Sequence, residues 1–117
     1  YDSGYRREAI AYYEKAIADD GDNLLALNNL AWTYAEEGIE LERALALSLR
    51  TVKEDENNVV YLDTYAEILH RAGETSRAIA IMTQALDIEG ESGRQYTYLL
   101  EQLEKFRTTT PIPESNI

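Results

Sequence analysis

One pair of residues in the sequence has the spacing of a known metal-binding motif. Glu67 and His70 form a Glu-x-x-His pattern, which in di-iron helical bundles puts both side chains on one helix face. A di-iron site also needs a second copy of the motif and two further inward-facing glutamates. The chain has one histidine, so the second copy is missing. We therefore predict no metal site and expect His70 to be a lone exposed or groove-side histidine.

No other set of residues in the sequence predicts catalysis. There is no cysteine nucleophile, no second histidine with which to build a Ser-His-Asp arrangement, and no glycine-rich phosphate loop. Pairs of carboxylates are numerous, but an acidic helical surface carries such pairs without catalysis. We therefore expect a protein that is not an enzyme and that binds no cofactor.

The excess of acidic residues excludes one class of expected partner. The chain carries 22 acidic against 11 basic residues, which gives a net charge of −11. Such a surface repels a phosphate backbone, so nucleic acid is not an expected partner. No apolar run approaches the roughly 18 residues that a membrane span requires. Because cysteine is absent, disulfide bonds give no clue to the compartment, and both a cytoplasmic and a cell-envelope location remain compatible with the sequence.

The elements that must position these residues repeat along the chain. Each of three copies has a glycine, then an alanine five or six residues later, then a small residue followed by a large aliphatic one. The alanines Ala9, Ala44 and Ala78 lie 35 and 34 residues apart. A fixed period of this length indicates an array of helical repeats, in which surfaces rather than single residues carry function.

Within each copy the apolar residues follow a helical period. Two segments place apolar residues at i, i+3, i+4 and i+7, which is one helix face: Leu27, Leu30, Ala31 and Tyr34, and then Leu62, Tyr65, Ala66 and Leu69. No segment alternates as a strand, so the predicted fold class is all-α. We expect six helices, near residues 5–19, 24–37, 41–54, 59–72, 75–88 and 93–106.

Glycine and asparagine residues punctuate these segments. Gly38 and Gly73 stand where a helix ends in a left-handed turn, and we expect Gly4 to be the matching turn glycine of the first copy. Asn23 and Asn58 stand where a helix begins, at positions that favour N-capping side chains.

The second and third copies resemble the tetratricopeptide repeat (TPR) family. Its pattern asks for a bulky residue, a large-small pair, an aromatic or large residue and a glycine, followed by a second helix with spaced alanines. The matching residues are Leu27, Leu30-Ala31, Tyr34, Gly38, Ala44 and Thr51, and then Leu62, Tyr65-Ala66, Leu69, Gly73, Ala78 and Ala85. The usual proline is replaced by Gly21, Glu56 and Gly90. The resemblance implies antiparallel helix pairs stacked in a right-handed superhelix.

The period divides the chain into an array over residues 1–106 and a flexible tail over residues 107–117. We expect the array to contain the second helix of a truncated repeat, two full repeats and a capping helix, over residues 4–23, 24–58, 59–92 and 93–106. One residue is extra between Gly38 and Ala44. Because the first repeat lacks its partner helix, we expect a fragment of a longer bacterial protein. Ile10, Tyr13 and Ile17 would then show apolar surface, which predicts self-association through the first helix.

In the TPR family the first helices of each pair line a concave groove in which partners bind. The corresponding face of this chain carries Asn28, Asn29, Trp32, Asp63, Glu67, His70, Thr97, Tyr98 and Glu101. Trp32 is either a binding anchor or a side chain packed over Tyr12 or Tyr13. The groove carboxylates either favour a basic or polar partner or form a solvated acidic face.

Two functional interpretations follow from the resemblance. The first is a non-catalytic scaffold that binds a protein or peptide segment in the groove. The second is an accessory helical segment of a larger enzyme, for example one with a thioredoxin-like domain upstream. A Cys-x-x-Cys motif in the upstream sequence would favour the second interpretation, whereas further repeats there would favour the first.

Overall fold

The computed structural model describes residues 2–109 of the chain, with side chains from residue 4 onward. This part of the chain is built from six helices without a strand, which confirms the predicted all-α fold class. No helix in it is both long and apolar enough to cross a membrane. The helices are α1 (Asp2–Asp19), α2 (Leu24–Glu37), α3 (Leu41–Glu54), α4 (Val59–Arg71), α5 (Thr75–Glu89) and α6 (Tyr96–Thr108).

The predicted caps set the ends of α2 and α4. The side chain of Asn23 accepts a hydrogen bond from the backbone N–H of Ala26 at 3.0 Å, and Asn58 caps α4 in the same way. Each cap satisfies an amide at the helix start that has no partner within the helix. Gly38 ends α2 with φ of 70°, the left-handed conformation that glycine adopts without steric cost.

The extra residue in the second repeat lies in the turn before α3. Glu40 precedes this helix and has φ of 52°. Among residues 2–109 it is the only residue other than glycine with a positive φ. A left-handed conformation costs a residue with a side chain about 1–2 kcal/mol. The insertion between Gly38 and Ala44 therefore makes this turn the locally strained one.

Two predictions about the helix ends were wrong. Gly4 does not form a turn but lies in the first turns of α1, because glycine permits a left-handed turn without requiring one. The last helix begins at Tyr96 rather than at residue 93. Gly93 donates its N–H to the carbonyl of Gly90, and Gln95 donates its N–H to the Glu89 carboxylate at 2.8 Å. These bonds hold residues 90–95 as turns. Residues 110–117, most of the predicted tail, lie outside the described residues.

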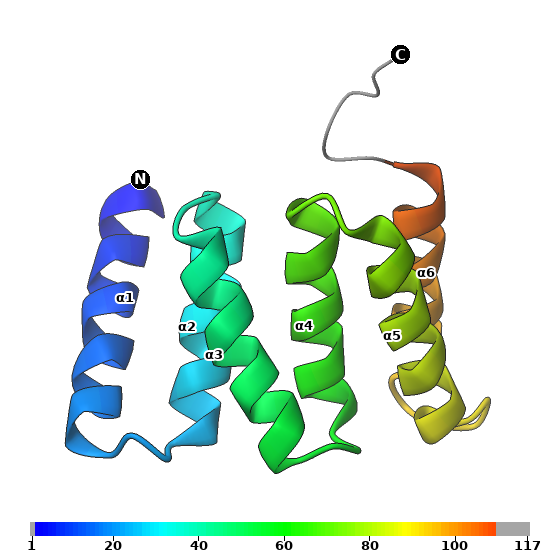
Figure 1. Ribbon diagram of the computed structural model, residues 1–117, viewed down its shortest axis with the longest axis horizontal. Helices are drawn as coiled ribbons and strands as arrows, with labels where there is room; N and C mark the ends of the chain where they lie inside the picture. Colours follow the sequence, from blue (N-terminus) through cyan, green and yellow to red (C-terminus); the bar gives the residue numbers. More distant parts are fainter. Residues whose placement is uncertain (1, 110–117) are drawn as a thin grey trace.

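The helices form two rows, and α4 sits at the centre of the packing. In Figure 1 they follow one another along the molecule, with α3 in front of α2 and α5 in front of α6. Helix α4 packs against α2, α3 and α5, and its side chains also bond to α6. As a result every residue of 62–70 is buried. Polar residues in this stretch must therefore find partners inside the protein.

The core follows the predicted large-small pattern. One cluster joins α4, α5 and α6, and a second joins α2, α3 and α4. The small residues of the repeat pattern, Ala31, Ala66, Ala78 and Ala85, are fully buried. Small side chains at these positions allow the close approach of antiparallel helices on which the stack depends.

Candidate functional site

The predicted groove residues come from three helices and form what we call the α2–α4–α6 face. On α2, Asn28 is buried while Asn29 and Trp32 are half-buried; on α4, Asp63, Glu67 and His70 are all buried; on α6, Thr97, Tyr98 and Glu101 are exposed. The polar side chains of α4 therefore lie below the surface of this face rather than on it.

Asp63 ties α4 to α6 through both of its carboxylate oxygens. The Tyr98 hydroxyl donates to Oδ2 at 2.9 Å and the Gln102 amide donates to Oδ1 at 2.9 Å. Burial raises the pKa of Asp63, and the two hydrogen bonds oppose this rise without cancelling it. The pKa of Tyr98 is also raised, first by burial of its hydroxyl and then by the nearby charge of Asp63. Asp63 is thus a costly buried carboxylate whose hydrogen bonds are made within the chain.

Glu67 is the second buried carboxylate and binds two cations. Lys105 Nζ and Arg71 Nε each lie 2.7 Å from its oxygens, and Gln102 donates a weaker bond at 3.2 Å. Burial alone would raise the pKa of Glu67, but the bonds from Lys105 and Arg71 outweigh it and lower the pKa. Arg71 also donates through Nη1 to the backbone carbonyl of Ala35 at 2.8 Å, which links α4 to the end of α2.

His70 is buried beneath the C-terminal end of this network, and it is not the exposed histidine that the sequence allowed. Its Nδ1 lies 3.0 Å from the Thr75 hydroxyl and its Nε2 lies 3.3 Å from the Thr109 hydroxyl. The ring packs on Phe106 with centroids 4.7 Å apart. Burial lowers the pKa of His70, which favours the neutral ring. Within residues 2–109, no three His, Cys, Asp or Glu side chains gather as metal ligands would.

A pocket of about 260 Å³ opens beside this network. Glu67, His70, Arg71 and Lys105 line it. The side chains of Arg71 and Lys105 remain 38% and 43% exposed, so part of each cation faces solvent although both bind Glu67.

At the junction between α2 and α4, Asn28 lacks the accepted hydrogen bonds that the equivalent residue, Asp63, makes at the α4–α6 junction. The Asn28 side-chain oxygen is buried and has no hydrogen-bond partner among the described residues. Asp63 and Glu67 stand 35 residues after Asn28 and Trp32, and they take the places that Tyr98 and Gln102 take one repeat later. Tyr98 and Gln102 are donors, whereas ionised carboxylates only accept. By this equivalence the α2–α4 junction has carboxylates at the positions where the α4–α6 junction has donors.

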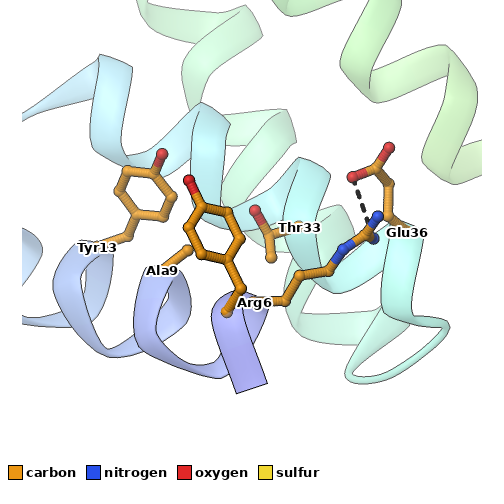
Figure 2. Close-up of a pocket in the computed structure, with 6 residues that line it drawn as sticks. Arg6, Ala9, Tyr13, Thr33 and Glu36 are labelled. Atoms are coloured by element: carbon orange, nitrogen blue, oxygen red, sulfur yellow. Dashed lines mark hydrogen bonds and ion pairs between the residues drawn. The ribbon is translucent and has the colours of Figure 1, made fainter. Parts of the chain in front are cut away.

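A second pocket, of about 350 Å³, lies between α1 and α2. It is lined by Tyr5, Arg6, Ala9 and Tyr13 from α1 and by Thr33 and Glu36 from α2. Figure 2 shows the Tyr13 side chain extending from α1, with Arg6 reaching across to Glu36 of α2. Arg6 Nη1 lies 3.4 Å from Glu36 and 3.0 Å from Glu37. The rim of this pocket is thus held by ion pairs.

The predicted self-association residues lie near this pocket. Ile10, Tyr13 and Ile17 are half-buried and pack against the cluster formed by α2, α3 and α4. The larger exposed apolar side chains of α1 are instead Tyr5 and Tyr12. Self-association through Ile10, Tyr13 and Ile17 stays a prediction.

Sequence reasoning did not assign Gln102, Lys105 or Arg71 a role in the network. The repeat period contained the signal for two of them, because Gln102 follows Glu67 and Lys105 follows His70 by 35 residues. Residues at equivalent positions of stacked helices face one another across a junction. The bond from Arg71 to a backbone carbonyl leaves no such trace in the sequence.

Two comparisons with known proteins bear on this arrangement. Residues 12–46 match a family model described as Tetratricopeptide repeat. The matched segment runs from the second half of α1 through α2 into α3. No curated protein matches the chain.

Proposed function

The chain belongs to the tetratricopeptide repeat family, and we propose that it is a non-catalytic interaction module that binds a basic or polar segment of a partner protein on the α2–α4–α6 face. Tetratricopeptide repeats generally mediate protein–protein interaction. The part of the face that binds the segment is the junction of α2 and α4, with Trp32 and Asn28 as its main contacts.

The unpaired side-chain oxygen of Asn28 carries this proposal. An unsatisfied acceptor buried in a protein costs about 1–3 kcal/mol, and such groups are rare in native structures. Asn28 is 5% exposed, and its Oδ1 finds no donor in the described chain. Because this oxygen is itself buried, the Asn28 side chain must turn toward the surface of the face before a partner N–H group can donate to it, and that bond then recovers the cost.

The chemistry of the partner follows from the surroundings of Asn28. Asp63 is a buried carboxylate without a cation bound to it, and Glu36, which pairs with Arg6 at 3.4 Å, adds an exposed carboxylate one turn beyond Trp32. Donors such as lysine, arginine, amide side chains and backbone N–H groups suit this region, whereas carboxylates do not. Trp32 sits one turn from Asn28 and offers a large half-buried ring on which the stem of such a side chain can pack.

Selection from a random library of twelve-residue peptides displayed on phage tests the proposal without a known partner. We expect selected peptides to be rich in lysine and arginine. Their affinity should fall about tenfold or more in Trp32→Ala, because an aromatic anchor contributes strongly to binding. Asn28→Ala should weaken the same peptides to a lesser extent.

Tyr12→Ala is the matched control, because it removes an exposed aromatic ring from α1, away from the proposed contacts. Circular dichroism of each variant establishes that the helices are retained. Selected peptides that are acidic, or that bind Trp32→Ala and the unchanged chain equally well, would refute the proposal.

A further inference from the structure

Two cations share one carboxylate at the 260 Å³ pocket that α4 and α6 line. Lys105 Nζ and Arg71 Nε each lie 2.7 Å from an oxygen of Glu67, whose side chain is only 5% exposed. In every other ion pair within residues 4–109, each carboxylate binds a single cation. The pocket is therefore a place of positive excess in a chain whose net charge is −11.

The four side chains that line the pocket carry one net positive charge. Burial would raise the pKa of Glu67, but the bonds from Lys105 and Arg71 lower it, so Glu67 is ionised at neutral pH. Burial lowers the pKa of His70, so its ring is neutral. Asp63, the other buried carboxylate of α4, does not line the pocket, and both of its oxygens already accept hydrogen bonds. One positive charge suits a ligand group with one negative charge.

The carboxylates of this junction are matched within the chain, whereas the solvent-facing N–H groups of the two cations are not. Lys105 has three N–H groups on Nζ, and Arg71 has five on its guanidinium. Within residues 4–109, Lys105 Nζ bonds to Glu67, and Arg71 bonds through Nε to Glu67 and through Nη1 to the carbonyl of Ala35. Arg71 Nη2 and two N–H groups of Lys105 thus stay available at the mouth of the pocket.

The same bonds hold both cations in place before a ligand arrives. Glu67 fixes one end of each, and the carbonyl of Ala35 holds Arg71 at a second point. Donors that are already immobilised lose little conformational entropy on binding. The pocket is smaller than the roughly 300–1,000 Å³ that hold a drug-sized ligand, so it suits one functional group of a larger ligand. Tetratricopeptide repeats generally mediate protein–protein interaction, which favours a protein as that ligand.

We propose that this pocket binds one carboxylate group, carried by an aspartate or glutamate side chain of a partner protein. Lys105 Nζ and Arg71 Nη2 donate charge-assisted hydrogen bonds to it, and Glu67 is the positioning residue that holds the two cations. A phosphate dianion would leave one negative charge unmatched beside Glu67. The site goes beyond the contacts proposed around Asn28 and Trp32 and does not depend on them.

Titration of the chain with blocked tripeptides, followed by two-dimensional proton–nitrogen NMR, tests this site. The probe acetyl-Ala-Glu-Ala-amide carries one carboxylate and no other charge. It should shift the Nε–H signal of Arg71 and the backbone amide of Lys105 saturably, with a dissociation constant in the millimolar range. The neutral probe acetyl-Ala-Gln-Ala-amide has nearly the same shape and should leave both signals in place, as should acetyl-Ala-Lys-Ala-amide.

Three variants locate the binding on the chain. Lys105→Gln should weaken binding of the glutamate tripeptide about fivefold, the loss expected for one half-exposed ion pair. Lys105→Arg keeps the charge and should keep the binding. Arg107→Gln is the matched control, because it removes a cation from the same helix at a place outside the pocket, where Arg107 pairs with Glu104. Circular dichroism establishes that each variant retains its helices.

Four results would overturn the proposal: no saturable shift with the glutamate tripeptide, an equal shift with the glutamine tripeptide, equal weakening by Lys105→Gln and Arg107→Gln, or tighter binding of inorganic phosphate, which would assign the pocket to a dianion. Each of them leaves the selection of basic peptides and the effect of Trp32→Ala unaffected, so a failure of this proposal is separate from a failure of the proposed function.

Discussion

The two ends of the helical stack are closed in different ways. At the C-terminal end, α6 covers α4 with buried apolar residues and with donors for the carboxylates of Asp63 and Glu67. At the N-terminal end, α1 is held by half-exposed groups: Arg6 pairs with Glu36 and Glu37, and the Tyr34 hydroxyl donates to Glu14 at 2.6 Å. Burial, and after it the hydrogen bond to Glu14, raises the pKa of Tyr34 to about 12.

The difference between the two ends lies in how completely each junction satisfies its own polar groups and covers its helices. A junction whose donors and acceptors are matched within the chain gains little from a further polar contact. A junction with an unpaired acceptor, or an uncovered helix face, gains from one. The Asn28 oxygen is such an acceptor and the half-buried side of α1 is such a face, and both lie on the N-terminal side of α4.

The largest expected difference is in apolar packing at the two ends. Phe106→Ala should lower the free energy of unfolding by about 3–5 kcal/mol, because it leaves a cavity against His70 in the closed end. Tyr13→Ala, at the open end, should cost about 1–2 kcal/mol because the ring is half-buried. Urea unfolding measures both. Equal losses of unfolding free energy in the two variants would contradict the difference in packing between the two ends.

A smaller difference is expected between two glutamates. Glu67→Gln replaces an acceptor facing Arg71 Nε by an amide donor, which should cost about 2 kcal/mol in urea unfolding. Glu36→Gln removes only a long contact to Arg6 at the surface and should cost less than about 0.5 kcal/mol. If Glu36→Gln proved as damaging as Glu67→Gln, the N-terminal ion pairs would be as important as the buried network.

The smallest expected effect is a pH-dependent change in the free energy of unfolding when Asp63 is replaced by asparagine. Because burial raises the pKa of Asp63, its carboxyl favours the folded state below its unfolded pKa of about 3.8 and loses this contribution as pH rises through the raised value. Asp63→Asn removes the charge while keeping a hydrogen-bonding group for Gln102 and Tyr98. At pH 7 this variant should therefore be as stable as the unchanged chain or more stable, by on the order of 1 kcal/mol.

Measuring the stability difference between Asp63→Asn and the unchanged chain at several pH values shows its direction of change. The advantage of Asp63→Asn should shrink as pH falls through the raised pKa, since the unchanged carboxyl then becomes neutral as well. Glu67 acts in the opposite sense: its pKa is lowered, so its contribution is present above its unfolded pKa of about 4.5 and is lost at lower pH. An advantage of Asp63→Asn that grew on acidification would contradict this assignment.

The sequence predicted the fold more completely than the site. Period, caps and small residues determine which helices form and how they pair, and these are local or repeated features. Glu67 shows why the site was harder: its position on the face was predicted, but not that Arg71 and Lys105 would bury and neutralise it. Burial on all sides depends on neighbours from four helices, and no local pattern encodes it. The sequence also predicted an uncovered apolar side on the first helix, but not that Tyr5 and Tyr12 would be its most exposed large side chains.

Hydrogen–deuterium exchange of the free chain tests the central claim most directly, since it reports the stability of each helix separately. The account predicts that amides of residues 62–70 exchange only through global unfolding, while amides of α1 near residues 6–17 exchange at least about tenfold faster. Equal protection of α1 and α4 in the free chain would contradict the claim that one end of the stack is closed and the other open.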